Sequence, residues 1–250
     1  MPDRGDLTLV RAEALAAGYG ATPVLTDVSF ALHAGERMGV LGPNGGGKTT
    51  LFRVLLGELV PVAGTLQAPA RFAVVPQTER SRLDFPVSAL DVALMGSIST
   101  LPWWRRPGRA QRRAARAALG AVGLREQADA TFGDLSGGQR QRVLVARALV
   151  QDARVILLDE PFTGLDAPSA DRLETLLGEL AAEGRGVMIA THDVDQAREW
   201  DTVLCLNRRQ VAFGAPAATL DRDVLEATYG GAIVELPGGD LRGVLPPHHH

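Results

Sequence analysis

The stretch that decides the fold is Gly42-Pro43-Asn44-Gly45-Gly46-Gly47-Lys48-Thr49, which follows the apolar residues 38–41 and opens a helical pattern over residues 49–57. Its glycines let successive backbone N–H groups point at phosphate oxygens, and the N-terminus of the following helix adds partial positive charge. In such a loop Lys48 reaches the terminal phosphates, and Thr49 offers its hydroxyl to a Mg²⁺ ion. About 0.001 chance matches to this pattern are expected from the composition. The stretch therefore predicts a strand, a phosphate-binding loop and a helix, in that order.

Lysine usage supports this interpretation of Lys48. Of the 26 basic residues, Lys48 is the one lysine and the other 25 are arginines. A random draw would leave the lysine at this position only one time in 26. Because an ammonium group is a compact point charge and a guanidinium group is a wide planar one, we infer that this position needs an ammonium.

Two carboxylates end a second strand pattern. Residues 155–158 are apolar and are followed by Asp159 and Glu160. Neighbouring residues of a strand point to opposite faces, so the two carboxylates should serve different roles. One is expected to hold the metal through water, and the other to act as base or orienting group for a water near the terminal phosphate. The alternative is a strand that simply ends in solvated acids. The presence of a phosphate loop in the same chain makes this alternative the weaker one.

The wider pattern predicts an α/β protein. Strand patterns cover residues 7–15, 28–32, 38–41, 155–158 and 186–190. Helical segments follow the later strands, which favours a largely parallel sheet.

The middle of the chain is predicted to be helical. Its segments 87–95, 109–122 and 137–150 have helical composition and apolar spacing. We therefore expect an α/β core of residues 1–80 and 151–230 with a helical subdomain, residues 81–150, inserted in it. Residues 231–250 are rich in glycine and proline and end in His248 to His250, which indicates a tail with the histidines of a purification tag.

Composition excludes several classes of protein. The chain has 250 residues, and 46% of them are apolar, which excludes a disordered protein. Its net charge is −3, which excludes a global positive field that would attract nucleic acid. The single cysteine, Cys205, lies in an apolar stretch and is expected to be a buried structural thiol. No eighteen apolar residues run together and the N-terminus has no signal pattern, so we expect a cytoplasmic location.

A second anion-binding helix terminus is predicted at residues 135–139, Leu-Ser-Gly-Gly-Gln. A serine and two glycines at a helix start offer backbone N–H groups and the positive end of the helix dipole. A simple N-cap is the plain alternative. Since one nucleotide in the first loop leaves a second terminus unexplained, the pair suggests a nucleotide held between two chains.

Together with the phosphate loop, the signature formed by residues 135–139 makes the chain resemble the ATP-binding subunit of an ABC transporter, over nearly its whole length to about Tyr229. The resemblance implies a P-loop NTPase (RecA-like) core, an N-terminal antiparallel β subdomain and the inserted helical subdomain. It also implies ATP and Mg²⁺ as ligands, ATP hydrolysis, and a twofold dimer in which each phosphate loop is completed by the signature of the opposite chain.

The resemblance assigns further site residues. Tyr19 matches the aromatic that stacks on adenine, and Gln77 the glutamine that links the Mg²⁺ site to the helical lobe. Asp166, in Gly164-Leu165-Asp166, matches the loop at the dimer interface. His192 matches the histidine that contacts the γ-phosphate, with a core histidine as the alternative.

Three sets of site residues are therefore expected. The catalytic residues are Glu160 as the base, His192 and Lys48. The residues that bind ATP are Tyr19, Gly42, Pro43, Asn44, Gly45, Gly46, Gly47, Lys48, Thr49, Thr50, Gln77, Ser136, Gly137, Gly138, Gln139 and Asp166. The neighbours of the magnesium ion are Thr49, Gln77 and Asp159.

Other stretches resemble the subfamily that imports zinc, manganese or iron ions with an extracytoplasmic binding protein: residues 83–87, 92–96, 161–164 and 225–230. We therefore expect integral-membrane permease subunits as partners on the cytoplasmic face of the cell membrane, and indirectly a metal-binding protein outside it. Siderophore and cobalamin importers are the nearest alternatives. A non-transport ABC ATPase is disfavoured because such proteins usually carry two cassettes or a long coiled coil.

One stretch has no role in this scheme. Trp103 and Trp104 open a segment with six arginines from Arg105 to Arg116. Aromatic and basic residues together can bind nucleic acid, but a solvated helix face, or one near lipid headgroups, is favoured by the acidic net charge. No nucleic-acid role is assigned.

Overall fold

A computed structural model describes residues 7–20, 22–68, 71–76, 86–102 and 104–230. Its strands are β1 (Thr8–Ala17), β2 (Leu25–His33), β3 (Arg37–Leu41), β4 (Ala63–Gln67), β5 (Phe72–Val75), β6 (Val155–Asp159), β7 (Gly186–Thr191), β8 (Thr202–Leu206) and β9 (Gln210–Gly214). Its helices are α1 (Lys48–Leu55), α2 (Ala89–Met95), η3 (Gly96–Thr100), α3 (Arg109–Ala121), η4 (Phe132–Asp134), α4 (Gly137–Val150), α5 (Ala167–Ala182), α6 (Val194–Ala197), α7 (Pro216–Thr219) and α8 (Arg222–Tyr229). None of these helices is long and apolar enough to cross a bilayer.

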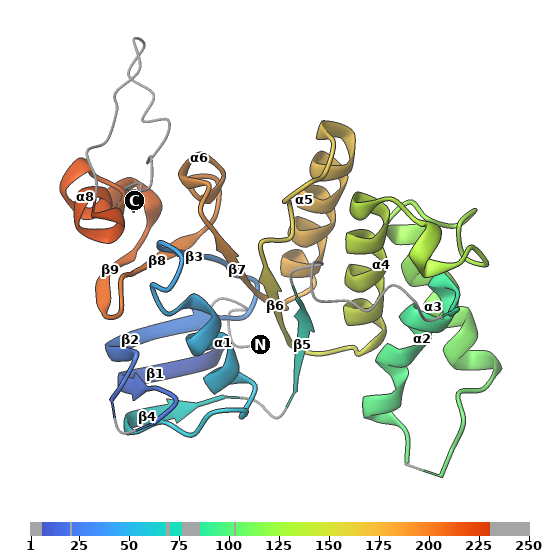
Figure 1. Ribbon diagram of the computed structural model, residues 1–250, viewed down its shortest axis with the longest axis horizontal. Coiled ribbons are helices and arrows are strands. Elements are labelled where there is room, and N and C mark those ends of the chain that lie inside the picture. Colours follow the sequence, from blue (N-terminus) through green and yellow to red (C-terminus); the bar gives the residue numbers. More distant parts are fainter. Residues whose placement is uncertain (1–6, 21, 69–70, 77–85, 103, 231–250) are drawn as a thin grey trace.

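The strands form two sheets (Figure 1). A three-stranded antiparallel sheet has the order β2-β1-β4, and a six-stranded sheet has the order β5-β6-β7-β3-β8-β9. In the larger sheet only β9 runs antiparallel, to β8. The predicted fold class, an α/β P-loop NTPase with an antiparallel β subdomain, is confirmed.

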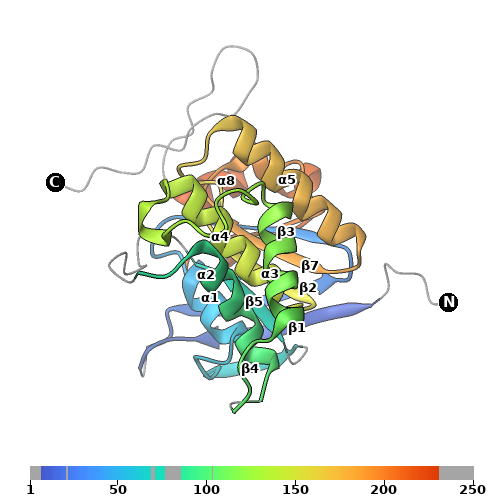
Figure 2. The ribbon, with the colours of Figure 1, turned by 90° about the vertical axis from the view of Figure 1, so that its right-hand side faces the viewer.

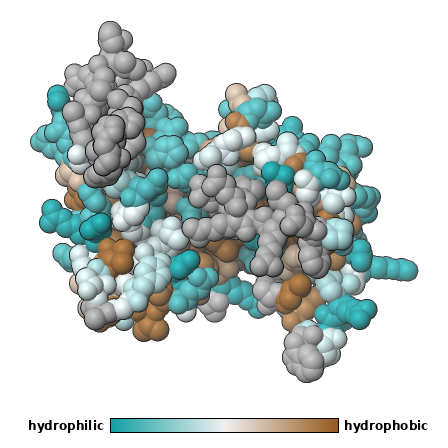
Figure 3. All heavy atoms as spheres, in the orientation of Figure 1, coloured by the Kyte–Doolittle hydropathy of each residue, from teal (hydrophilic) through white to brown (hydrophobic). Residues whose placement is uncertain are grey.

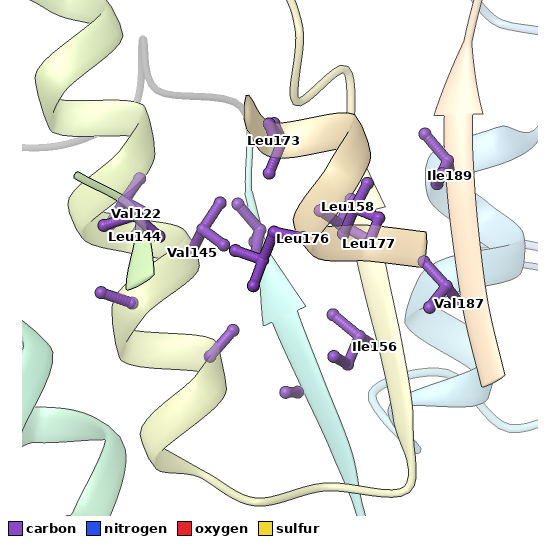
Figure 4. Packing of buried hydrophobic residues seen from close by; sticks show 14 of the residues in the cluster. Val122, Leu144, Val145, Ile156, Leu158, Leu173, Leu176, Leu177, Val187 and Ile189 are labelled. Atoms are coloured by element: carbon purple, nitrogen blue, oxygen red, sulfur yellow. The ribbon is translucent and has the colours of Figure 1, made fainter. Parts of the chain in front are cut away.

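The larger sheet lies between two hydrophobic clusters, because its central strands are apolar on both faces. In β6, Ile156 and Leu158 face a cluster shared with α2, α3, α4 and α5, while Val155 and Leu157 face a cluster shared with α1 and the antiparallel sheet. Figure 4 shows the first cluster, where Leu173 and Leu176 of α5 lie among side chains of α4 and β6. Both faces of the strand that carries Asp159 are therefore held by packing.

The predicted helices of the middle segment are present, with shifted ends. Figure 2 looks onto α2, α3 and α4, with the sheets behind them. The prediction of a helix from residue 87 is corrected to Ala89, because Ser88 is an N-cap whose Oγ accepts from the Asp91 N–H at 3.1 Å. The inserted helical subdomain with limits at residues 81 and 150 stays a prediction, since residues 77–85 lie outside the described part.

Other boundaries also differ from the sequence pattern. The first strand extends to Ala17 instead of residue 15, and the helix after the glycines spans Lys48–Leu55 rather than residues 49–57. The helix ends earlier because Gly57 adopts φ +73°, a left-handed conformation that stops it. Strands β4, β5, β8 and β9 were not predicted, since they are short and three of the four, β4, β5 and β9, lie at sheet edges. Cys205 in β8 is buried as expected, and burial raises the pKa of its thiol to about 11.

Candidate functional site

The glycine-rich loop lies between β3 and α1, and its glycines are required by the backbone. Gly42 has φ +157° and Gly47 has φ +105°. A Cβ on Gly42 would lie 2.2 Å from the Leu206 carbonyl oxygen, and one on Gly47 would lie 2.7 Å from the Leu25 side chain. Side chains at these positions would therefore push the loop away from β2 and β8.

Lys48 is the first residue of α1, and its ammonium group is turned back on the loop. It donates to the carbonyl oxygens of Gly42 at 2.5 Å and Pro43 at 3.2 Å, and the residue is 7% exposed. Burial lowers the pKa of Lys48, while the carboxylates of Glu160 and Asp159 act to raise it. The group is thus a buried cation held inside the loop by two carbonyls and facing two acids.

The two carboxylates lie at the end of β6, where the neighbouring strand β7 also ends. Asp159 is the last residue of β6 and pairs with Ala190 of β7. Glu160 then adopts φ +48°, and its N–H donates to the Ala190 carbonyl at 2.9 Å. A left-handed glutamate is uncommon and strained. This turn ends the strand and breaks its alternation, so the two acids are free to serve the same pocket.

Glu160 meets His192 because their strands are neighbours. The His192 Nδ1 lies 3.4 Å from one Glu160 carboxylate oxygen, and the Thr163 hydroxyl donates to the other at 3.3 Å. The Glu160 side chain is 15% exposed and that of His192 is 67% exposed. The carboxylate is therefore oriented on both sides, with the imidazole between it and solvent.

A pocket of about 320 Å³ opens over the loop. It is lined by Tyr19, Val24, Pro43, Asn44, Gly45, Gly47, Lys48, Thr49, Thr50, Pro76, Asp159 and Glu160. The structure thus brings most of the predicted phosphate and magnesium residues into one place. Gln77 lies outside the described residues.

Tyr19 stands at the rim of this pocket with 58% of its surface exposed. The Arg53 guanidinium lies 5.5 Å from the centre of its ring, and Arg53 Nη1 donates to the tyrosine hydroxyl at 3.3 Å. A cation over one ring face fixes the ring and leaves it as a platform for a flat heterocycle.

The oxygen chemistry of the pocket fits a magnesium ion bound together with phosphates. Thr49 and Asp159 both line it, and Mg²⁺ prefers one or two such oxygen ligands with phosphates and waters completing its shell. Bound there, the ion would neutralise charge that develops on the phosphate oxygens. No cage of protein ligands is needed for this task.

The signature residues form the N-cap of α4, and they do not line the pocket. Ser136 caps α4: its Oγ accepts from the Gln139 N–H at 3.2 Å, and Gln139 Oε1 accepts from the Ser136 N–H at 2.9 Å. The plain N-cap alternative is thus part of the structure, and the N–H groups of Gly137 and Gly138 remain first-turn donors. Of the described residues that line the pocket, none belongs to residues 135–139.

Asp166 lies beside the signature rather than beside the loop. It is the N-cap of α5 and accepts from the Ser169 N–H at 3.0 Å. Hydrogen bonds from the side chain and from the backbone N–H of Ser169 lower the pKa of its carboxyl. The Leu165 side chain before it lies close to Gly138. Figure 1 shows α4 and α1 on opposite sides of β5 and β6, so the signature and the loop are separated within one chain.

Sequence reasoning missed several residues that shape the site. Thr163 and Arg53 contact predicted residues, and Leu206 with Arg208 supports the loop from behind: the Arg208 N–H donates to the Gly46 carbonyl at 2.8 Å. Thr163 lies only three residues after Glu160, which is the one local signal among these contacts. The other contacts have no local signal.

A family model described as "ABC transporter" matches residues 25–163 of this chain, more than half of it. The match begins at β2 and extends past Glu160, so it includes the glycine-rich loop, the signature and both carboxylates.

Curated relatives match almost the full length. The zinc transport system ATP-binding protein TroB of Treponema pallidum is 38% identical over 252 residues, which is 96% of this chain and 95% of TroB. The manganese transport system ATP-binding protein MntB of Bacillus subtilis is 38% identical over 227 residues, 87% of this chain and 91% of MntB.

Solved structures share the fold. A metal-chelate type ABC transporter in an inward-facing conformation contains a chain that is 32% identical, with a TM-score of 0.83 and 90% of each chain covered. The subunit cbiO1 of Clostridium perfringens, part of the ABC transporter complex cbiONQ, is 27% identical, with a TM-score of 0.75 over 89% of this chain and 94% of cbiO1.

Proposed function

The chain belongs to the ABC transporter family as an ATP-binding, ATP-hydrolysing subunit, and we propose that it powers an importer for a divalent metal ion, zinc or manganese. The observation that carries the metal assignment is the full-length similarity to the ATP-binding proteins of zinc and manganese transport systems. Within that activity, we assign the binding and hydrolysis of ATP to the residues of the pocket.

We assign Lys48 and the loop amides to the β- and γ-phosphates, and Tyr19 to the adenine. Thr49 and Asp159 would hold the magnesium ion, and Gln77, which lies outside the described residues, is assigned to the same neighbourhood. Glu160 accepts the proton of the attacking water, since its carboxylate is already oriented by Thr163 and the imidazole of His192. His192 contacts the γ-phosphate from the exposed side of that carboxylate.

Lys48→Arg is expected to weaken ATP binding by about tenfold to a hundredfold, the range of a lost buried hydrogen bond to a charged group. The ammonium fits between two carbonyls in a space that a planar guanidinium would overfill. Titration with a fluorescent ATP analogue measures the change, with exposed Arg71→Lys as the matched control. Wild-type affinity in Lys48→Arg would contradict this role for the ammonium.

The active unit in this proposal is a twofold dimer that closes around two ATP molecules, each held by the loop of one chain and the signature of the other. Separation of the two motifs within one chain supports this arrangement. Closure would then act on integral-membrane permease subunits at the cytoplasmic face, which in turn receive metal from an extracytoplasmic binding protein.

Transport of a metal chelate is the second candidate, favoured by the 32% identity and TM-score of 0.83 to a chain of a metal-chelate type transporter. Uptake of radioactive Zn²⁺, Mn²⁺, a ferric siderophore and cobalamin separates the two in cells that express the chain together with its permease subunits. Free Zn²⁺ or Mn²⁺ uptake that is lost in Glu160→Gln is the expected result. Uptake confined to the siderophore or to cobalamin would overturn the proposal.

A further inference from the structure

The end of the helical lobe remote from the signature carries a concentration of positive charge. We call residues 95–102 and 104–116, which the structure describes, the basic tip. From residue 92 to residue 125 the chain has seven arginines and no acidic residue, which leaves the remainder of the chain at a net −10. This charge separation is the strongest in the sequence, and the ATPase machinery does not use it.

Four of these arginines form a stripe along α3. Arg109, Arg112, Arg113 and Arg116 follow the spacing i, i+3, i+4, i+7, which places them on one face of a helix. All four are exposed, while Ala115 and Leu119 on the opposite face are buried against the rest of the lobe.

The stripe is largely unneutralised. Arg116 pairs with Asp129 at 3.0 Å, and the other three arginines make no ion pair among the residues that the structure describes. Arg105 and Arg106, just before α3, are exposed as well.

Exposed apolar side chains accompany the arginines. Trp104 is 71% exposed, Ile98 is 62% exposed and Met95 is 43% exposed. Figure 3 shows hydrophobic and strongly hydrophilic residues next to each other on the lower part of this lobe. Large apolar groups beside unpaired cations are costly in water, and both find partners at the surface of an anionic bilayer.

The basic tip remains accessible when two chains close around ATP. Gly96 packs against Arg147 and Val150 at the C-terminal end of α4, whereas the signature lies at its N-terminal end. A helix of 14 residues is about 21 Å long at a rise of about 1.5 Å per residue. The tip is therefore one helix length away from the residues that the proposed dimer would cover.

We propose that the basic tip binds the surface of an anionic lipid bilayer. In this arrangement Arg109, Arg112 and Arg113 face the lipid phosphates, while Trp104 and Ile98 enter the headgroup region. Nucleic acid fits less well, because aliphatic side chains such as those of Ile98 and Met95 do not stack on bases and the rest of the chain is acidic. The inference does not depend on which substrate the transporter carries.

Vesicle flotation tests the inference with the purified full chain and no permease, so its outcome is independent of the proposed transport function. Vesicles of phosphatidylcholine with phosphatidylglycerol should carry the protein at low salt, and pure phosphatidylcholine vesicles should not. Binding should fall as salt is raised. In a Trp103→Phe chain, Trp fluorescence should also shift to the blue on binding, because Trp104 leaves water, whereas Trp200 is only 4% exposed and does not report.

Two double variants isolate the basic tip. Arg112→Gln with Arg113→Gln is expected to weaken vesicle binding about thirtyfold, because each arginine near an anionic surface contributes about fivefold. The matched control, Arg71→Gln with Arg154→Gln, removes two exposed arginines that precede the N-terminal ends of β5 and β6, outside residues 95–116, and should bind as the parent does. ATPase activity without vesicles should be unchanged in both.

Three results would overturn the proposal. The first is a wild-type chain that does not float with anionic vesicles. The second is equal loss of binding in the tip variant and in the control variant, which would mean that net charge alone matters. The third is tip-dependent binding to a labelled DNA duplex with none to vesicles, which would assign the tip to nucleic acid.

Discussion

Glu160→Gln is expected to retain ATP binding and to lower the rate of hydrolysis by a factor of ~10²–10⁴, the range of a lost general base. Glutamine keeps the size of the side chain and can still accept from Thr163, but it cannot take the proton of the attacking water. The carboxylate is 15% exposed and lies 3.4 Å from His192, so solvent does not readily replace it. Steady-state phosphate release and equilibrium ATP binding, measured on the same protein, separate the two effects.

Glu179→Gln is the matched control, because Glu179 is an exposed glutamate of α5 away from the pocket. It should hydrolyse ATP as the parent does. Phosphate release near the parental rate in Glu160→Gln would assign the base to another group. Loss of ATP binding together with turnover would instead mean that the charge of Glu160 supports Lys48, because burial lowers the pKa of Lys48 and this carboxylate acts against that lowering.

Ser136→Arg is expected to abolish ATP-dependent dimer formation in the Glu160→Gln background while leaving ATP binding to the monomer intact. Ser136 caps α4 and lies outside the lining of the pocket around Lys48. A bulky cation there would block the first-turn N–H groups that we assign to the partner's γ-phosphate, and the lost cap would cost about 1 kcal/mol of stability. Size-exclusion chromatography with ATP measures the dimer, and Ser88→Arg, at the N-cap of α2, controls for the loss of a cap.

A mixture of two inactive variants gives the sharper test of shared sites. Ser136→Arg supplies an intact loop, and Lys48→Ala supplies an intact signature. If sites are shared, the mixture can form one complete composite site, and an ATP-dependent dimer should appear that neither variant forms alone. If each chain holds a whole site, the mixture has none. Dimer formation by Ser136→Arg alone, equal to its parent, would rule out sharing.

The local sequence was sufficient to predict those parts of the site that lie within one continuous stretch of the chain. The loop from Gly42 to Thr49 could be located because phosphate binding needs glycines, a cation and a helix start in one continuous order. Asp159 and Glu160, at the end of β6, could be located because an apolar run that ends in carboxylates is equally local. The fold class followed from the same alternation of strands and helices.

Only the tertiary structure decided which residues far apart in the sequence contact each other. Strand order places β6 beside β7, which brings Glu160 to His192, and it places β3 beside β8, so that Leu206 and Arg208 support the loop. It also sets Arg53 over Tyr19 and separates the signature from the pocket. A pattern of local periodicity contains no information on strand order, because pairing depends on packing between segments far apart in sequence. The sequence thus determined which chemical groups are present, and the packing of the sheet determined which of them act together.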